Sequence, residues 1–194
     1  MSGVKKIQKE DILDAALDII REEGINNVQA RNIAKKLNCS TQPIFYQFKN
    51  MEELKEELFK KIIEVYREYL TVDEKAPHLY RQMGEGYIRF AKEEPKLFGL
   101  IFMSPNNLTT RNFITQDEKV YNDILKYVNA TTGISSEERV RNFHLKMWTF
   151  THGIATMIAT KTCGISDEQI SEMLTEEFKA LMLLERGIDK WTTL

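Results

Sequence analysis

Apolar residues recur along most of the chain at spacings of three and four, which is the period of an α-helix with one face on a core. The first such stripe lies at offsets 0, 3, 4 and 7 and consists of Leu13, Ala16, Leu17 and Ile20. No segment shows the sustained alternation of period two that a half-buried strand requires. The pattern predicts an all-α protein with about nine helices.

Local signals indicate where these helices begin and end. Gly24 predicts the end of the first helix, because glycine adopts a positive φ without steric cost. Ser40 or Thr41 is expected to cap a short third helix, Asn50 a long fourth helix and Ser166 the last one. The predicted helices cover residues of about 9–23, 30–37, 41–48, 51–71, 78–94, 97–103, 110–128, 136–162 and 166–185. Loops are expected at 72–77, 104–107 and 129–134.

The charge distribution is more informative than the formal net charge of −2, which argues against a generic nucleic-acid coat. Residues 26–50 contain basic side chains and no acidic one: Arg31, Lys35, Lys36 and Lys49. Acidic residues lie on both sides of this window. A locally basic window in an acidic protein is typical of a compact DNA-reading module. A solvated basic face explains the charges alone equally well.

Several functional classes find no support in the sequence. The two cysteines, Cys39 and Cys163, form neither a disulfide framework nor a metal pattern and suit a reducing cytoplasm. There is no secretory signal, and the longest nearly uncharged run, 147–160, is too short to span a bilayer. No catalytic motif, glycine-rich phosphate loop or metal cluster occurs. We therefore expect a cytoplasmic protein that is not an enzyme and has no cofactor or metal.

The first three predicted helices have the layout of a helix-turn-helix, in which the third helix reads DNA. Tight turns are expected at 24–27 and 38–40. The first turn of the third helix presents Thr41, Gln42 and Pro43 toward base edges. A glutamine can bond adenine through two hydrogen bonds, and threonine or proline can contact a thymine methyl group. Ile44 and Phe48 are expected in the core.

At this point the chain resembles the tetracycline-repressor (TetR) family. The resemblance covers about residues 6–60, and it is carried by 11–17, Gly24, 31–34 and 40–54. The last stretch, STQPIFYQFKNMEEL, resembles the family signature of a serine, an aromatic pair, a phenylalanine and the start of the fourth helix. The resemblance implies a helix-turn-helix domain at 1–50, with helix 51–71 connecting it to a ligand-sensing and dimerisation domain at 72–194.

The resemblance also implies the residues that contact DNA. Arg31 matches a position that contacts phosphate or a base, and Gln29 stands where hydroxyl residues usually bind phosphate. Tyr46 either packs or contacts phosphate. The expected DNA-binding set is Gln29, Arg31, Thr41, Gln42, Pro43, Phe45, Tyr46, Gln47 and Lys49.

Two positions depart from the family pattern. Phe45 stands where the family usually has a tyrosine, so one phosphate hydrogen bond is lost there. Met51 stands where a lysine usually opens the fourth helix, and Lys49 can supply that charge. These departures change the expected contacts and leave the module as it is.

The second half resembles the family less specifically. Residues 148–153 resemble a Trp-x-x-x-His-Gly motif of one subgroup. The family binds its ligand in this half, and soft and aromatic side chains suit a mostly apolar ligand. The expected pocket residues are Met83, Tyr87, Phe90, Phe98, Phe102, Phe113, Tyr121, Trp148 and His152. Ordinary core packing is the competing interpretation for each of them, and for His152 a core histidine with one hydrogen bond.

Dimerisation is expected because one short reading helix covers only a few base pairs. Two copies on a two-fold axis would read half-sites roughly 34–36 Å apart. The family dimerises through its last two helices, which here implies an interface that contains Phe150, Ile154, Ile158, Phe178, Leu181 and Met182.

The sequence thus predicts a homodimeric repressor that binds double-stranded operator DNA and is released by a small, mostly apolar effector. Two alternatives stay open. One is a DNA-binding protein of the same fold that a protein partner controls. The other is a small helical enzyme or adaptor, and salt-dependent binding to duplex DNA would separate it from the first two.

Overall fold

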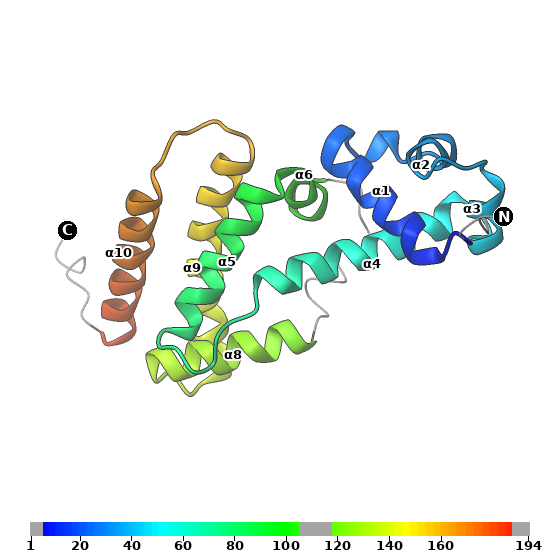
Figure 1. The fold of residues 1–194 in the computed structure, drawn as a ribbon. Helices are drawn as coiled ribbons and strands as arrows, with labels where there is room; N and C mark the ends of the chain where they lie inside the picture. The colour runs from blue at the N-terminus through cyan, green and yellow to red at the C-terminus, as the bar shows by residue number, and fades with distance from the viewer. Residues whose placement is uncertain (1–5, 105–117, 188–194) are drawn as a thin grey trace. The chain divides into compact units, whose positions relative to one another are not determined.

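The computed structural model describes residues 6–104 and 118–187, and these form an all-helical fold (Figure 1). The described residues contain nine α-helices, one 3₁₀ turn, one π-helical turn and no strand, which confirms the predicted fold class. In chain order the elements are α1 (Lys9–Glu23), η1 (Ile25–Asn27), α2 (Ala30–Lys36), α3 (Gln42–Gln47), α4 (Met51–Tyr69), α5 (Leu79–Glu93), α6 (Pro95–Phe98), η2 (Gly99–Met103), α8 (Glu118–Thr132), α9 (Glu137–Ala159) and α10 (Asp167–Glu185). None of the helices in these ranges is long and apolar enough to cross a membrane.

The helices form two compact units. The first contains the chain up to Glu68 together with Lys96–Met103, and the second contains Tyr69–Pro95 and the chain from Ser104 onward. The polypeptide therefore passes between the units three times. Helix α4 lies in the first unit except for its last residue, Tyr69, after which the chain continues into the linker at 70–78.

The core of the first unit is built from the apolar stripes of α1 to α4. The completely buried side chains on these helices include Ile12, Ile33, Ile44 and Leu54, and Phe48, directly after α3, is 1% exposed. Helix α1 begins where the Asp11 carboxylate accepts a hydrogen bond from the Gln8 N–H at 2.8 Å. It ends at Gly24, whose φ of +93° confirms the predicted stop.

The ends of α3 and α4 test the predicted caps. At α4, Asn50 Oδ1 accepts a hydrogen bond from the Glu53 N–H at 2.9 Å, and the Glu53 carboxylate accepts one from the Lys49 N–H at 2.6 Å. The Asn50 cap is therefore confirmed. At α3, Thr41 occupies the cap position in a helical conformation, and its hydroxyl makes no capping hydrogen bond. The expectation of a hydroxyl cap from Thr41 was wrong.

The second unit packs α5 against α8 and α9, and α10 against α9. Its core contains Phe90 of α5, Val128 of α8 and Phe143 of α9, each almost fully buried. Helix α10 begins as predicted, because Ser166 Oγ accepts a hydrogen bond from the Gln169 N–H at 3.2 Å and the Gln169 side-chain carbonyl oxygen accepts one from the Ser166 N–H at 2.9 Å.

The turn between α8 and α9 differs from the prediction. Helix α8 continues to Thr132, where a loop was expected from Asn129 onward, and Gly133 ends it with a φ of +74°. The Asn129 amide holds the turn by donating to the Ile134 carbonyl at 2.7 Å. The expected beginning of this helix, near residue 110, lies outside the described residues.

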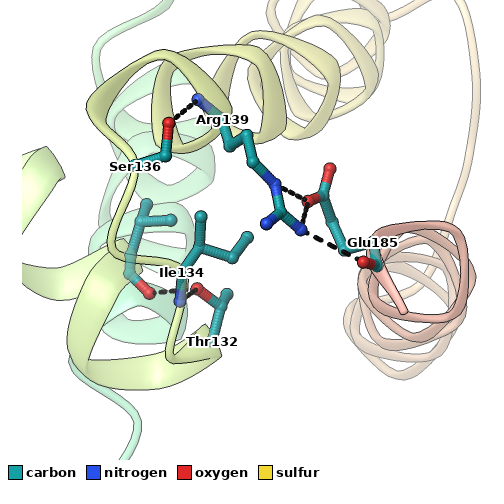
Figure 2. A network of polar contacts seen from close by, with 6 residues as sticks. Thr132, Ile134, Ser136, Arg139 and Glu185 are labelled. Atoms are coloured by element: carbon teal, nitrogen blue, oxygen red, sulfur yellow. Dashed lines mark hydrogen bonds and ion pairs between the residues drawn. The ribbon is translucent and has the colours of Figure 1, made fainter. Parts of the chain in front are cut away.

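A polar network then ties the start of α9 to the end of α10 (Figure 2). Ser136 Oγ accepts from the Arg139 N–H at 3.5 Å, and the Arg139 guanidinium binds the Glu185 carboxylate at 2.7 and 3.0 Å. The same guanidinium donates to the Glu185 carbonyl at 3.1 Å. These contacts fix the last turn of α10 against α9.

Candidate nucleic-acid interface and sensor residues

Helix α3 divides into an inner and an outer face. Ile44 and Phe48 point into the core of the first unit, with 0% and 1% of their surface exposed. On the outer face, Phe45 is 49% exposed and Tyr46 is 75% exposed. Two large aromatic side chains are thus presented to solvent on one short helix, which is uncommon on a surface that has no binding function.

The outer face also carries a hydrogen-bonded amide. Gln42 and Tyr46 are one helical turn apart, and Gln42 Nε2 donates a hydrogen bond to the Tyr46 hydroxyl at 2.6 Å. Both side chains are exposed, as is Thr41, whereas Pro43 is half-buried. Of the predicted base-reading residues at the beginning of α3, Thr41 and Gln42 are thus accessible to solvent and Pro43 is partly accessible.

Gln47 occupies a different position from the other predicted contacts. Its side chain is half-buried, and its amide donates to the Ile7 carbonyl at 3.3 Å. This hydrogen bond ties α3 to the segment before α1. Part of the hydrogen-bonding capacity of Gln47 is thus directed into the protein.

The basic window around α2 and α3 separates into two groups. Lys36 binds Glu22 at 2.7 Å and Asp18 at 3.7 Å, and the hydrogen bond to Glu22 raises the pKa of Lys36. Arg31, Lys35 and Lys49 have exposed side chains. Lys36 therefore neutralises acidic groups of α1, whereas Arg31, Lys35 and Lys49 carry positive charge on exposed side chains.

Arg31 and Gln29 lie next to each other at the beginning of α2. Arg31 Nε donates to Gln29 Oε1 at 3.3 Å, and Gln29 Nε2 donates to the Asn26 carbonyl at 3.3 Å. Both side chains are exposed. The structure therefore places two predicted DNA contacts in one short hydrogen-bonded chain on the surface.

Acidic residues that flank the window in sequence are paired with cations inside the first unit. Glu57 binds Lys9 at 2.8 Å and Lys60 at 2.7 Å, and the hydrogen bonds from Lys60 and Lys9 lower the pKa of Glu57 to about 2. Lys61 of α4 pairs with Asp14 at 2.7 Å and with Glu10. These ion pairs reduce the negative field that α1 and α4 would otherwise add near the basic surface.

In the second unit, two tyrosine–histidine hydrogen bonds join α5 to α9. The Tyr87 hydroxyl lies 2.8 Å from His152 Nδ1, and the Tyr80 hydroxyl lies 3.0 Å from His144 Nδ1. Trp148 stacks on the His152 ring, with 4.9 Å between the ring centroids. Three of the predicted pocket residues, Tyr87, Trp148 and His152, are therefore joined through His152.

Burial keeps both histidines neutral near neutral pH. It lowers the pKa of His144 to about 4 and also lowers the pKa of His152. Burial raises the pKa of Tyr80, so the partner of His144 is a neutral phenol. The Tyr80–His144 pair was not expected from the sequence. The sequence signal for it is the spacing. The two tyrosines are seven residues apart and the two histidines eight, so the tyrosines share one face of α5 and the histidines share one face of α9.

The remaining predicted pocket residues do not all lie in one place. Met83 and Phe90 are buried on α5, and Tyr121 donates through its hydroxyl to Glu137 at 3.0 Å. Phe98 and Phe102 belong to the first unit, where their rings lie 5.0 Å apart. Phe113 lies outside the described residues.

The predicted dimer residues also separate by exposure. Ile154 and Leu181 are buried inside the protomer. The other four, Phe150, Ile158, Phe178 and Met182, are half-buried on α9 and α10. Large hydrophobic side chains that the sequence reasoning did not single out are more exposed, namely Leu145 of α9 at 57% and Leu183 and Leu184 of α10 at 46% and 45%.

Cysteine and metal chemistry add little to these surfaces. Cys39 is half-buried and Cys163 is exposed, and both are thiols. Across residues 6–104 and 118–187 there is no group of three or more His, Cys, Asp or Glu side chains that could hold a metal ion.

Comparison with known proteins gives two family matches. Residues 12–58 match the family described as bacterial regulatory proteins, tetR family. Residues 80–181, more than half of the chain, match the family described as tetracyclin repressor-like, C-terminal domain.

Curated relatives are regulators of several kinds. A helix-turn-helix-type transcriptional regulator of Haemophilus influenzae is 29% identical over 101 residues, which are 50% of this chain and 54% of that protein. The class D tetracycline repressor of Escherichia coli is 28% identical over 64 residues, 33% of this chain and 29% of the repressor. The fatty acid metabolism regulator protein of Bacillus subtilis is 28% identical over 139 residues, 69% of each chain. The chain thus spans about half or less of the length of the first two relatives.

Solved structures with the same fold cover nearly the whole chain. A TetR-like transcriptional regulator from Rhodococcus sp. RHA1 superposes with a TM-score of 0.66 at 14% identity, over 92% of this chain and 97% of that one. A TetR-family transcriptional regulator from Haemophilus influenzae gives a TM-score of 0.66 at 20% identity, over 89% and 94%.

Proposed function

The chain belongs to the tetR family of bacterial regulatory proteins, and we propose that it is a repressor that binds double-stranded operator DNA as a homodimer and is released by a small effector. We assign DNA reading to the first unit, and ligand sensing and dimerisation to the second. In this proposal the protein acts by binding rather than by catalysis. It would act in the cytoplasm, because operator DNA lies there.

The observation that carries the proposal is the outer face of α3. A helix that reads a major groove needs exposed side chains with hydrogen-bonding groups or apolar surface, above a rigid inner face. Here Ile44 and Phe48 anchor the inner face, and the outer face presents Gln42, Phe45 and Tyr46. Thr41 adds a hydroxyl at the same end of the helix.

Exposed cations supply the contacts to phosphate in this proposal. Arg31, Lys35 and Lys49 surround α3 in sequence and are exposed, so each can approach the DNA backbone. Such contacts hold the module in register without reading sequence. The ion pairs of Glu57 with Lys9 and of Lys61 with Asp14 support this role, because they leave fewer uncompensated carboxylates in the first unit.

Dimerisation would use α9 and α10. Leu183 and Leu184 expose apolar surface near the end of α10, and the Arg139–Glu185 contacts hold that turn in place (Figure 2). A two-fold interface built on this surface would bury the leucines and set the distance between two reading helices.

Effector control would act through the covalent connections between the units. Segment Lys96–Met103 leaves the second unit, packs into the first through the buried Leu97 and Phe98, and returns. Lys96 Nζ donates to the Glu22 carbonyl at the end of α1, which ties this segment to the reading module. A ligand that favours one arrangement of the second unit would thereby shift α1 and α4, provided that its affinity differs between the two states.

The ligand would be mostly apolar, with few polar anchors. In this proposal the apolar side chains of Met83 and Phe90, both buried on α5, would line the site, and the Tyr87–His152 pair would supply hydrogen-bonding groups. Because His152 is neutral near pH 7, it would act toward such a ligand as a hydrogen-bonding group rather than as a cation.

Binding to DNA fragments from upstream of the protein's own coding sequence tests the proposal. The wild-type protein should bind one fragment with at least about tenfold preference over a scrambled duplex of equal composition, given typical specificity ratios. Gln42→Ala should remove most of that preference, and Asn122→Ala, an exposed amide of α8, should retain it. Equal binding to native and scrambled duplexes, or no binding at all, would contradict the proposal and favour the enzyme or adaptor alternative.

A further inference from the structure

The amide of Gln42 and the hydroxyl of Tyr46 form one unit on the outer face of α3. We propose that Tyr46 determines sequence specificity by fixing the amide of Gln42, so that Gln42 selects adenine over guanine at one position of each half-site. This inference rests on the proposed function, because it assigns a base preference to the same DNA-reading surface.

The geometry places the two groups in register. Residues four apart on a helix lie on the same face, one turn above the other. Gln42 Nε2 lies 2.6 Å from the Tyr46 oxygen, and both side chains are exposed, so the pair stands on the accessible surface. The Tyr46 ring itself is 75% exposed, so removal of its hydroxyl does not disturb the core of the first unit.

The hydrogen bond decides what Gln42 has left to offer. A glutamine amide carries two N–H donors and one carbonyl acceptor. The Tyr46 hydroxyl accepts one of the two donors, which leaves one N–H and Oε1 of the exposed Gln42 available for a base. In the major groove, adenine presents the N7 acceptor and the N6 donor, whereas guanine presents two acceptors, N7 and O6. The remaining donor–acceptor pair of Gln42 therefore matches adenine and not guanine.

Tyr46 also lowers the cost of ordering the glutamine. An unsupported glutamine side chain loses rotamer freedom when it docks on a base, and this loss weakens the contact. Tyr46 holds the amide plane before DNA arrives. Loss of the hydroxyl would let the amide turn over and present either edge, so the preference for adenine over guanine should fall more than the affinity itself.

A direct contact between Tyr46 and phosphate would behave differently. Phosphate contacts carry no sequence information directly, so their loss weakens binding to all duplexes by a similar factor. Loss of a residue that acts through Gln42 changes the ratio of the affinities for the adenine and guanine duplexes. In a Gln42→Ala background the same loss has no effect on that ratio. The base preference and the dependence on Gln42 thus separate the two roles.

The test begins with selection of bound sequences from a duplex library with a randomised central segment, using the full chain. Four duplexes that differ only at the position sensitive to Gln42→Ala are then titrated by fluorescence anisotropy. The proteins compared are wild type, Tyr46→Phe, Gln42→Ala, the double variant and, as control, Tyr127→Phe, whose hydroxyl lies in the second unit near Glu74. Unfolding midpoints measured in urea verify that each variant is folded.

The wild type and Tyr127→Phe should prefer adenine over guanine by about 5- to 150-fold, the range of one good bidentate contact. Tyr46→Phe should lose most of this ratio, and the double variant should match Gln42→Ala. A preference for guanine, an equal loss on all four duplexes in Tyr46→Phe, or no position sensitive to Gln42→Ala would overturn the role of the pair. A wild type that enriches no sequence would overturn the proposed function itself.

Discussion

At the scale of single residues, α5 carries two glycines with opposite surroundings. A Cβ added at Gly86 would lie 1.9 Å from the Tyr69 carbonyl oxygen and 3.0 Å from the Tyr69 carbonyl carbon, so the backbone at the end of α4 lies directly against this position. A Cβ added at Gly84 would meet nothing within 4 Å. Only Gly86 is therefore required by packing.

Substitution of each glycine by alanine should change stability in opposite directions. Gly86→Ala should lower the free energy of unfolding by about 1–3 kcal/mol, because a backbone group must move. Gly84→Ala should raise the free energy of unfolding by about 0.5–1 kcal/mol. Alanine has fewer backbone conformations than glycine in the unfolded chain, so it loses less entropy when the helix forms. Urea denaturation of the two variants measures both values. Equal effects of the two substitutions would contradict the close approach at Gly86.

Residue-level reasoning from sequence succeeded where a signal is local. Gly24, Asn50 and Ser166 end or begin helices as predicted, because a cap involves only neighbouring residues. The sequence did not predict that Lys36 pairs with Glu22, fourteen positions earlier, because that contact depends on how α1 and α2 pack. The Tyr80–His144 pair was not predicted for the same reason, because it depends on how α5 and α9 pack.

At the scale of elements, α10 is the clearest candidate for contact with a second copy of the chain. Its inner side packs on α9 through Phe178, whose ring lies 5.6 Å from that of Phe143. Leu183 and Leu184 remain exposed near its end. Apolar side chains of this size, adjacent on a helix end, are typical of a surface that another protein covers.

Charge placed on this surface should separate the protomers. Leu183→Glu combined with Leu184→Glu should shift the protein from dimer to monomer in sedimentation velocity at micromolar concentration, because two buried carboxylates per subunit would be unpaired. Both positions are exposed in the protomer, so its fold should persist. Ala130→Glu, on an exposed position of α8, is the control and should remain dimeric. A dimer that survives the double substitution would place the interface elsewhere.

The pattern of apolar positions predicted most elements, because a stripe with helical period requires a helix facing a core. It failed at the end of α8, where helix extends to Thr132, since a few polar residues can lie in a last helical turn or in a loop alike. The outer face of α3 followed from the same periodicity. The placement of Phe98 and Phe102 in the first unit did not, because periodicity does not say which unit a short apolar segment joins.

At the scale of the whole molecule, two features support one account. The chain passes between its two units three times, and one of the segments between these passages, Lys96–Met103, is anchored to α1 through Lys96. The first unit presents the exposed outer face of α3, the proposed reading helix, and exposed cations in the neighbouring sequence, Arg31, Lys35 and Lys49. A repressor needs both a surface for DNA and a physical connection from sensor to reader.

The salt dependence of DNA binding tests the central claim, that the surface around α3 binds duplex DNA, most directly. The logarithm of the binding constant for a selected duplex should fall linearly with the logarithm of salt concentration. Lys35→Ala removes one phosphate-binding cation and should make the slope shallower by roughly one. Lys75→Ala, at an exposed lysine of the second unit, should leave the slope unchanged. A slope near zero in the wild type, or the same slope in both variants, would contradict this account.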